Sequence, residues 1–327
     1  MAGLSDRPFR RLCRTFGADL AVSEMISAKG LVYGDRKSRV LLAPDESDRP
    51  HWVQLFGADP EIIREAAEIA LAEGAELVDI NMGCPVRKVI KTGAGAALLR
   101  DPGRAEAIMR ALNRAPALPY TIKIRRGWNE DSPVLERFID LAALHGARAL
   151  TCHPRTAVMM FSGRADWDFL EQAAVRAALP VIGSGDINDV DTALAALERP
   201  GIAAIMLGRG TLGRPWFFRE ILARRDEGRS WHPDPELRLR TIIEHGRLLR
   251  VEYGEKTGLL LYRKHLAWYS RGLPGAAAFR QRLFTIGDFA SLTEAVGALI
   301  AGTGRDRDFS PPGKKSSDIS ARKEIHD

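Results

Sequence analysis

Polar side chains follow the short β-branched runs of this sequence, at positions where the carboxyl end of a buried strand would expose them. They are Glu24, Gln54, Asn81, Lys123, Arg125, His153, Arg155, Ser184 and Asp186, followed by a glycine-flanked Arg209. One such residue alone is typical of an ordinary loop hydrogen bond. A polar or glycine-rich group after every predicted strand is hard to attribute to chance. It predicts a binding site for a polar ligand at one edge of a sheet.

Two glycine-rich segments, residues 183–186 and 208–210, have the composition of phosphate-binding loops. Glycine lets backbone N–H groups approach an anion, and the loops after the last two strands of an eight-stranded barrel commonly hold a phosphate. Arg209 would add a fixed positive charge. The pattern leaves flavin, sugar phosphate and pyridoxal phosphate open, since Lys123 could form a Schiff base. Two ordinary glycine turns are the simpler alternative.

A thiol follows one of the predicted strands, in the segment NMGCP (residues 81–85). A cysteine with a pKa of about 8.5 is mostly protonated at neutral pH, so Cys84 could donate a proton as well as act as a nucleophile. Cys13 and Cys152 fit small buried apolar groups better. Three scattered cysteines predict no disulfide framework and no metal site, and they indicate thiols in a reducing compartment.

Short β-branched runs alternate with amphipathic helical patterns over the first two thirds of the chain. Strands are predicted at residues 20–25, 51–56, 77–82, 120–125, 148–153, 180–184 and 203–207, and helices at 60–73, 104–113, 134–145, 167–177 and 190–197. This alternation predicts an α/β protein with a parallel sheet, a (β/α)8 TIM barrel. Seven strands are found where a closed barrel needs eight, and turn-like residues follow Met1 at once. We therefore expect a barrel whose first strand is truncated.

From Trp216 onward the strand pattern stops and only helical patterns remain, at residues 235–253, 259–270, 276–286 and 292–301. We expect a catalytic barrel domain over residues 1–230 and a small all-helical domain over residues 235–302. Residues 303–327 are polar and cannot bury enough apolar area to fold, so a disordered tail is predicted there.

The composition is typical of a folded enzyme. The 327 residues are 45% hydrophobic, which excludes a mainly disordered chain, and 30 glycines and 18 prolines exclude a coiled coil. The net charge of +6 and the pI near 9.4 are compatible with a polyanionic partner. The sequence has no secretory signal pattern and no run of about 18 apolar residues. We expect a monomer in the cytoplasm with no membrane segment and no metal.

A basic stretch between residues 256 and 287 holds six cations and no acid. Arg263, Lys264 and Trp268 can share one helical stripe, with His265 and Tyr269 beside them. Cations and aromatic rings on one surface suit phosphate contacts and base stacking, which favours RNA as a partner. The alternative is a solvated basic helix with Trp268 in the core of the helical domain.

Eight segments in this order resemble the tRNA-dihydrouridine synthases. They are DRPFR (6–10), VSEM (22–25), VQLFG (53–57), DINMGCP (79–85), KIRRGW (123–128), HPRT (153–156), SGDI (184–187) and LGRG (207–210). GRPWFF and YRKHLAWY are similar to the DusB-like bacterial branch, and the resemblance covers about residues 1 to 290. Ser184 stands where the family usually has asparagine, which leaves backbone contacts to a phosphate intact.

The resemblance implies an FMN-dependent oxidoreductase acting on a CH–CH group, with NADPH or NADH as reductant and tRNA as substrate. It implies hydride transfer from FMN N5 to C6 of specific D-loop uridines, and a proton from Cys84 to C5. The cofactor contacts implied are Met1, Ala2, Gln54, Asn81, Lys123, His153, Ser184, Gly185, Asp186, Gly208 and Arg209. Together with the basic stretch it predicts tRNA contacts from Arg125, Arg155, Arg263, Lys264, His265, Trp268 and Tyr269.

Two other functions share some of these features. A flavin-containing barrel that reduces a free small molecule, similar to dihydroorotate dehydrogenase, would use the same phosphate loops and Lys123 but has no use for the basic helical domain. A non-catalytic RNA-binding protein built on an incomplete barrel would use the basic helices but bind no flavin.

Overall fold

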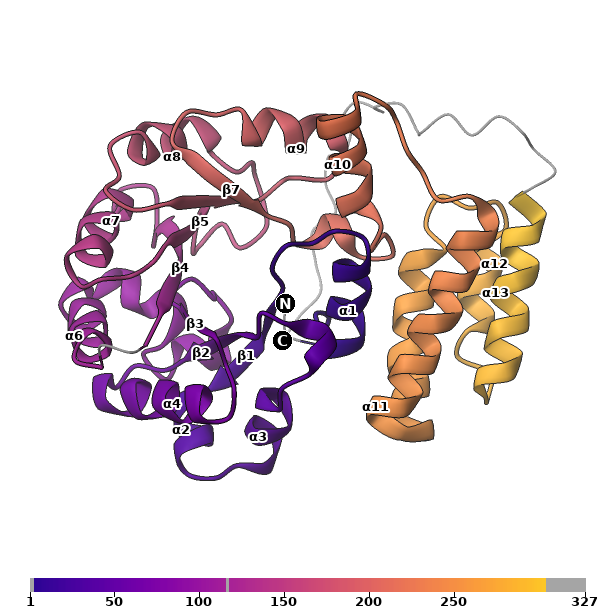
Figure 1. Ribbon diagram of the computed structural model, residues 1–327, viewed down its shortest axis with the longest axis horizontal. Coiled ribbons are helices and arrows are strands. Elements are labelled where there is room, and N and C mark those ends of the chain that lie inside the picture. The colour runs from indigo at the N-terminus through magenta and orange to yellow at the C-terminus, as the bar shows by residue number, and fades with distance from the viewer. Residues whose placement is uncertain (1–2, 116–117, 304–327) are drawn as a thin grey trace, which may run out of the picture. The chain divides into compact units, whose positions relative to one another are not determined.

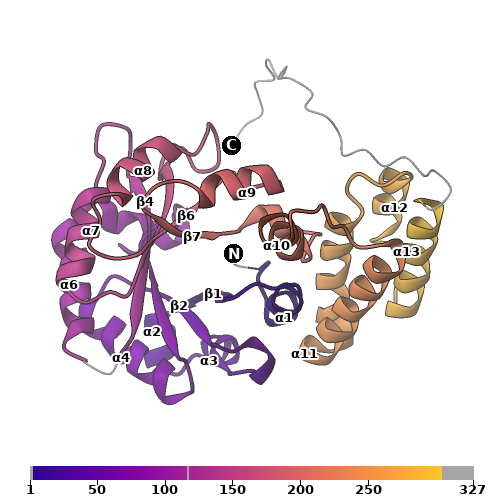
Figure 2. The same cartoon turned by 45° about the horizontal axis from the view of Figure 1, so that its top comes forward.

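The computed structural model describes residues 3–115 and 118–303, and the chain divides into two compact units, residues 1–233 and 234–327. The first unit is built on a seven-stranded parallel sheet whose strands pair in chain order (Figure 1). The strands are β1 (Val22–Ser27), β2 (Trp52–Phe56), β3 (Leu77–Asn81), β4 (Tyr120–Gly127), β5 (Leu150–Thr156), β6 (Val181–Ser184) and β7 (Ile202–Met206). The helices lie outside this curved sheet (Figure 2).

The parallel pairing in chain order confirms the predicted α/β barrel fold. Within the described residues β1 and β7 are the two edges of the sheet. Met1 and Ala2, predicted to contact a cofactor, lie outside the described residues, and so does the predicted disordered tail beyond Thr303.

Most helices of this unit begin at a capping side chain. The helices are α1 (Arg7–Thr15), α2 (Ala28–Val32), α3 (Arg36–Leu42), α4 (Pro60–Ala72), α5 (Arg87–Ile90), α6 (Pro102–Asn113), α7 (Leu135–Leu144), α8 (Trp167–Ala174), α9 (Val190–Leu197) and α10 (Phe217–Glu227), with 3-10 turns η1 (Glu46–Asp48), η2 (Gly95–Arg100) and η3 (Arg209–Thr211). Asp59 and Asp101 cap α4 and α6 by accepting N–H groups of the first turn, and a proline occupies the first helical position of each. The helices α5, α7 and α10 begin without a capping side chain.

The two faces of the sheet carry different side chains because successive residues of a strand point to opposite sides. Ile80, Ile122 and Cys152 are fully buried in the main apolar core, which also contains residues of the surrounding helices. The intervening residues are polar, and the register places Asp79 beside Thr121 and Asn81 beside Lys123 on the same face. The inner face of the barrel is therefore lined by polar groups, while the apolar core lies under the helices.

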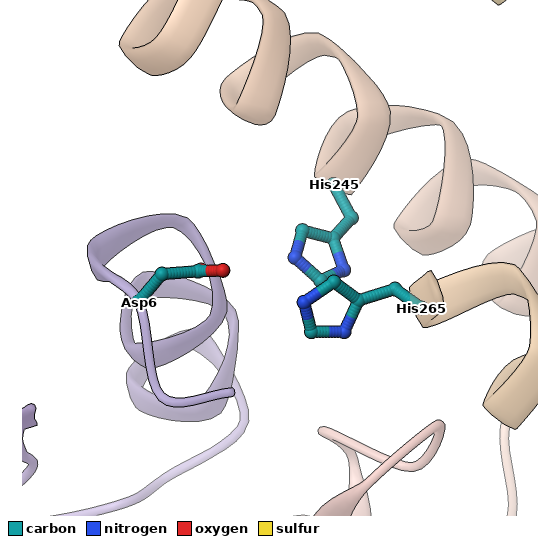
Figure 3. Close-up of side chains that lie close together, drawn as sticks. All are labelled: Asp6, His245 and His265. Carbon is teal, nitrogen blue, oxygen red and sulfur yellow. The ribbon is translucent and has the colours of Figure 1, made fainter. Parts of the chain in front are cut away.

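The second unit consists of α11 (Pro235–Tyr269), α12 (Ala276–Arg282) and α13 (Phe289–Thr303). α11 is interrupted at Gly254, whose φ of +73° and ψ of 176° are not helical, so the element is two helices joined by a turn. This agrees with the two helices predicted at residues 235–253 and 259–270. Across the turn the ring centroids of His245 and His265 lie 4.2 Å apart. Figure 3 shows the two rings facing each other.

The interior of this helical hairpin is polar as well as aromatic. The His245 ring is within 3.0 Å of the Tyr269 hydroxyl through Nδ1, and the Tyr262 ring stacks on Phe289 of α13 at 5.6 Å between centroids. Burial and the neighbouring His265 ring hold the pKa of His245 well below its usual value, so it is neutral in the folded chain. No helix in the described residues has the length and apolarity that crossing a membrane requires.

Replacing Gly254 by alanine tests the turn of the hairpin. The backbone angles at Gly254 belong to a region that only glycine occupies readily, so Gly254→Ala should lower the free energy of unfolding by about 1–3 kcal/mol. Gly297→Ala, inside α13, is the matched control, because neither position has an atom within 4 Å of an added Cβ. The control should raise stability by up to about 1 kcal/mol, as alanine favours helix. Urea unfolding followed by circular dichroism measures both, and equal effects would contradict the assignment of the turn.

Candidate active site

A buried carboxylate, Asp79, lies at the centre of the polar inner face. Its side chain accepts hydrogen bonds from the Thr121 hydroxyl at 2.6 Å and from Gln54 Nε2 at 2.7 Å. Burial raises the pKa of Asp79, and the two hydrogen bonds and the Lys123 charge oppose that rise. Asp79 was not predicted as a site residue, since an acid in the middle of a strand gives no signal of its role.

The Gln54 amide connects Asp79 to the loop that carries the thiol. Gln54 Oε1 accepts a hydrogen bond from Asn81 Nδ2 at 3.0 Å, and Asn81 Oδ1 accepts the backbone N–H of Cys84 at 2.9 Å. The carbonyl of Cys84 accepts the N–H of Ala96 at 3.0 Å. The predicted neighbours Gln54, Asn81 and Cys84 are thus joined in one network, and Cys84 is held by its backbone with its side chain partly exposed.

Lys123 shares the inner face with this network. It is paired in register with Asn81 on one side and Thr151 on the other. Burial lowers the pKa of the Lys123 ammonium, and the Asp79 charge opposes that change. No hydrogen bond or ion pair of the Lys123 side chain is found among the described residues, and the buried Thr151 hydroxyl also has no partner there. The partly exposed Lys123 ammonium can therefore bind a ligand at this face.

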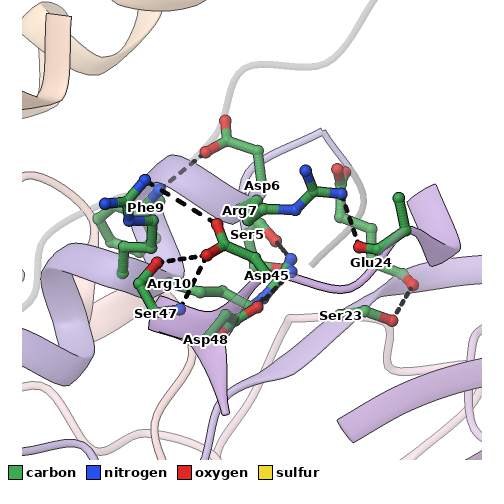
Figure 4. Close-up of polar contacts among 12 residues, drawn as sticks. Ser5, Asp6, Arg7, Phe9, Arg10, Ser23, Glu24, Asp45, Ser47 and Asp48 are labelled. Carbon is green, nitrogen blue, oxygen red and sulfur yellow. Dashed lines mark hydrogen bonds and ion pairs between the residues drawn. The ribbon is translucent and has the colours of Figure 1, made fainter. Parts of the chain in front are cut away.

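Hydrogen bonds and a buried ion pair join the N-terminal segment of the barrel to the residues before β2, and β1 to β2 (Figure 4). The Arg10 guanidinium donates to Asp48 Oδ2 at 2.7 Å and to the Ser5 carbonyl at 2.8 Å, and both charged side chains are buried. In β1 the Ser23 hydroxyl accepts the N–H of Gln54 at 2.9 Å and donates to the Glu24 carbonyl at 2.8 Å. These contacts fix α1 on η1 and β1 on β2.

On β5, His153 and Arg155 form a second cluster with Asp186, which follows β6. Arg155 pairs with the Asp186 carboxylate at 2.8 Å, and it donates to the carbonyls of Ser162 and Gly163 at 2.9 and 2.8 Å. Its Nη1 also lies 3.1 Å from His153 Nε2. Arginine has only donors, so this nitrogen must accept and the His153 proton sits on Nδ1. Arg155, predicted to contact tRNA, is instead 3% exposed and holds the loop after β5.

The two glycine-rich segments follow β6 and β7. Gly185 has a φ of +116°, and a Cβ there would lie 2.5 Å from the His153 ring of β5, so only glycine fits at this position. Ser184 is partly exposed, and Asp186 accepts the Ala165 N–H as well as Arg155. Within the described residues the N–H groups of Gly185, Gly208 and Arg209 donate to no protein acceptor. They are available to an anion, and phosphate binding by these two segments stays a prediction.

Arg125 of β4 lies close to the ring of Phe161, and only Arg125 was predicted as a site residue. The Arg125 guanidinium donates to the carbonyls of Gly83, Thr156 and Met160 at 3.1, 2.9 and 2.7 Å, so it fixes the loops after β3 and β5. Phe161, in the loop after β5, is 53% exposed, and both Arg125 and Arg209 lie over its ring, at 5.6 and 4.6 Å from the centroid. The apolar run at residues 158–161 was the only sequence signal for it.

The RNA contacts predicted in the basic stretch have different environments within the helical unit. His265 and Tyr269 are buried at 0% and 1% exposure, so the prediction that these rings contact RNA is not supported by their positions. Arg263 donates to the carbonyl of Ile286, which joins α11 to the segment before α13. Lys264 and Trp268 are partly exposed and remain predicted contacts.

Comparisons with known proteins identify relatives over nearly the whole chain. A family model described as dihydrouridine synthase (Dus) matches residues 1–300. A tRNA-dihydrouridine synthase B from Pseudomonas aeruginosa is 40% identical over 290 residues, covering 88% of this chain and 87% of the relative. One from Escherichia coli K12 is 38% identical over 301 residues, covering 92% of this chain and 94% of the relative. A solved histamine dehydrogenase from Rhizobium sp. 4-9 has a TM-score of 0.49 at 10% identity, covering 73% of this chain and 46% of that one, which is too weak to carry an argument.

The protonation of His153 can be measured directly. Burial, and then the nearby cations of Lys123, Arg125, Arg155 and Arg209, lower the pKa of His153 to about 2. Because the unfolded chain takes up this proton below about pH 6.5 and the folded chain does not, the contribution of His153 to stability is lost as the pH falls below that value, by about 1.4 kcal/mol per pH unit. An NMR titration should show the His153 ring resonance, assigned by its absence in His153→Asn, unchanged from about pH 8 to pH 5. A titration midpoint near the ordinary value would contradict the geometry.

Proposed function

Since the chain belongs to the dihydrouridine synthase family of oxidoreductases, we propose that it reduces the C5–C6 double bond of specific uridines in the D-loop of tRNA. The proposal includes FMN as the bound cofactor and NADPH or NADH as the reductant. The names of its relatives, which are tRNA-dihydrouridine synthases, support the substrate. The observation that carries the proposal is a partly exposed thiol held by a hydrogen-bond network beside a half-buried lysine without a protein partner among the described residues.

The residues of the inner face fit a phosphorylated, anionic cofactor. The Lys123 ammonium has no hydrogen-bonding partner in the described chain, although burial disfavours its charge, so an anionic or acceptor group of a ligand would stabilise it. The N–H groups of Gly185, Gly208 and Arg209 would hold a phosphate, and Arg209 adds a positive charge. Gln54, Asn81 and the neutral His153 offer hydrogen-bonding groups to the edge of a planar ring.

Bound FMN, once reduced, would supply a hydride to C6 of the uracil. The proton needed at C5 would come from the Cys84 thiol, so that the base gains one hydride and one proton and the double bond becomes a single bond. Asn81 positions that thiol through its hydrogen bond to the Cys84 N–H. Arg125 fixes the same loop from the other side by its hydrogen bond to the Gly83 carbonyl. A thiol held in this way can face one side of a base whose other side meets the cofactor.

Access of the base to this face requires unstacking. A uridine in a folded RNA must leave its stack to reach the inner face of a barrel, at a cost of a few kcal/mol, and a loop is where this costs least. The exposed ring of Phe161 lies in the loop after β5, which Arg125 and Arg155 fix, and it offers an apolar surface at the entrance. Phe161 and the two arginines therefore shape the entrance for a planar base.

The test of the function is anaerobic. The purified protein is reduced with NADPH, and re-oxidation of its flavin is followed by absorbance after tRNA made without modifications is added. We expect rapid re-oxidation by tRNA and none by free uracil or orotate. Re-oxidation by orotate alone would make the protein a reductase of a small molecule, and a colourless protein that binds tRNA would exclude the flavin-dependent reaction.

Cys84→Ala isolates the proton donor. Removing a general acid costs about 10²–10⁴-fold in rate, so formation of dihydrouridine should fall by this factor while reduction of the flavin by NADPH is unchanged. Mass spectrometry of the tRNA measures the product. Dihydrouridine formed at the parental rate would exclude Cys84 as the acid.

Lys123→Met tests the cofactor contact. Loss of a hydrogen bond to a charged group should weaken FMN binding by about ten- to a hundredfold. The exposed Lys88 provides the matched control, since Lys88→Met removes the same charge and adds the same side chain outside the inner face. Flavin content after dialysis is the measurement, and equal retention in the two variants would remove Lys123 from the cofactor site.

A further inference from the structure

The helical unit carries a hollow of about 370 Å³ that is separate from the inner face of the barrel. It is lined by Ala267, Trp268, Arg271, Gly272 and Arg280. Its size is within the range of small-ligand sites, about 300–1,000 Å³. The lining combines one indole, two guanidinium groups and two small residues, and it contains no acid.

The end of α11, the turn that follows it and Arg280 of α12 build this hollow. His265, Leu266 and Tyr269 of the last turns of α11 are buried, which leaves Trp268 on the accessible stripe. The His265 ring meets the Trp268 ring at 69° with 5.4 Å between centroids, so a buried neighbour fixes the indole. A ring held in this way loses little conformational entropy when a ligand binds to it.

The two arginines reach the hollow from opposite sides of the turn between the helices. Arg271 is the second residue after the end of α11 and is exposed, and Arg280 lies on α12 with its Nη1 3.4 Å from the Ser270 hydroxyl. Neither has an ion pair within the described part of the chain, whereas many arginines of the barrel unit, such as Arg64 and Arg199, are paired with carboxylates. No acid occurs between residues 256 and 287, so the charge of this pair is not compensated locally.

An indole beside two unpaired guanidinium groups is suited to a nucleotide. A base stacks on an aromatic ring with about 1–3 kcal/mol, and arginine binds phosphate through its planar fork of donors. We propose that this hollow binds one unstacked nucleotide of the RNA substrate, with its base on Trp268 and a phosphate between Arg271 and Arg280. This nucleotide is distinct from the uridine that is reduced. The inference rests on the proposed function and adds a second nucleotide-binding site to it.

The experiment measures binding of unmodified tRNA to the full-length protein by fluorescence anisotropy, at several salt concentrations. Trp268→Ala should weaken binding by about five- to a hundredfold, and Trp268→Phe should retain most of the affinity because a phenyl ring still stacks. Arg271→Ala and Arg280→Ala should each reduce the slope of log K against log salt by about 1. The exposed Arg137 of α7, which has no ion pair in the described residues, is the control, and Arg137→Ala should leave affinity and slope unchanged.

A second readout identifies the ligand. Photo-crosslinking with 4-thiouridine-substituted tRNA should join the RNA to the peptide that contains Trp268, and excess NADPH should not compete. Wild-type affinity in Trp268→Ala and in both arginine variants would overturn the inference while leaving the proposed function intact, whereas no tRNA binding by the parent protein would overturn both. Competition by NADPH, or an altered KM for NADPH in Trp268→Phe with unchanged tRNA affinity, would assign the hollow to the reductant and also overturn the inference. Circular dichroism checks that each variant is folded.

Discussion

The burial of the Asp79 carboxylate is the constraint from which the geometry of the barrel site follows. A buried charge is tolerated only when hydrogen bonds and an opposite charge compensate for lost hydration. Thr121 and Gln54 supply the hydrogen bonds, and Lys123 supplies the charge. Because the Gln54 amide is oriented by Asp79, its oxygen is directed to Asn81, and Asn81 in turn holds the Cys84 loop. The thiol is thus positioned by a chain of contacts that begins at Asp79, in the middle of β3.

Much of the fold and part of the site could be predicted from the sequence, because both depend on strand periodicity. Alternating strands and helices determine a parallel sheet in chain order, and the carboxyl ends of such strands lie at one edge. Gln54, Asn81 and Lys123 therefore come together as expected. Asp79 was missed because its partners lie on two other strands. Phe161 was missed because its loop depends on a positive φ at Met160 and on hydrogen bonds from distant arginines.

The arginines show that a cation predicted to contact a partner can also have a structural role. Arg125, Arg155 and Arg263 were predicted to bind tRNA, and each donates to backbone carbonyls and fixes a loop or a helix end. Their contacts with RNA stay predictions. His265 and Tyr269 were predicted to contact RNA beside a surface stripe of the helix, but α11 folds back at the Gly254 turn and both rings are buried. Helical periodicity defines stripes on a helix, but it cannot tell which stripe a partner helix will cover.

Two of the three cysteines are buried, which leaves Cys84 as the thiol that a reagent can reach. Cys13 and Cys152 are 6% and 0% exposed, and burial raises the pKa of both thiols, that of Cys152 to about 12. Neither is accessible as a thiolate to an alkylating reagent in the folded chain. Cys84 is partly exposed on its loop. An alkylating reagent or an active-site spin label can therefore be attached at one atom of the native protein, without removing the other two cysteines, and it reports from the point where the base and the thiol are proposed to meet.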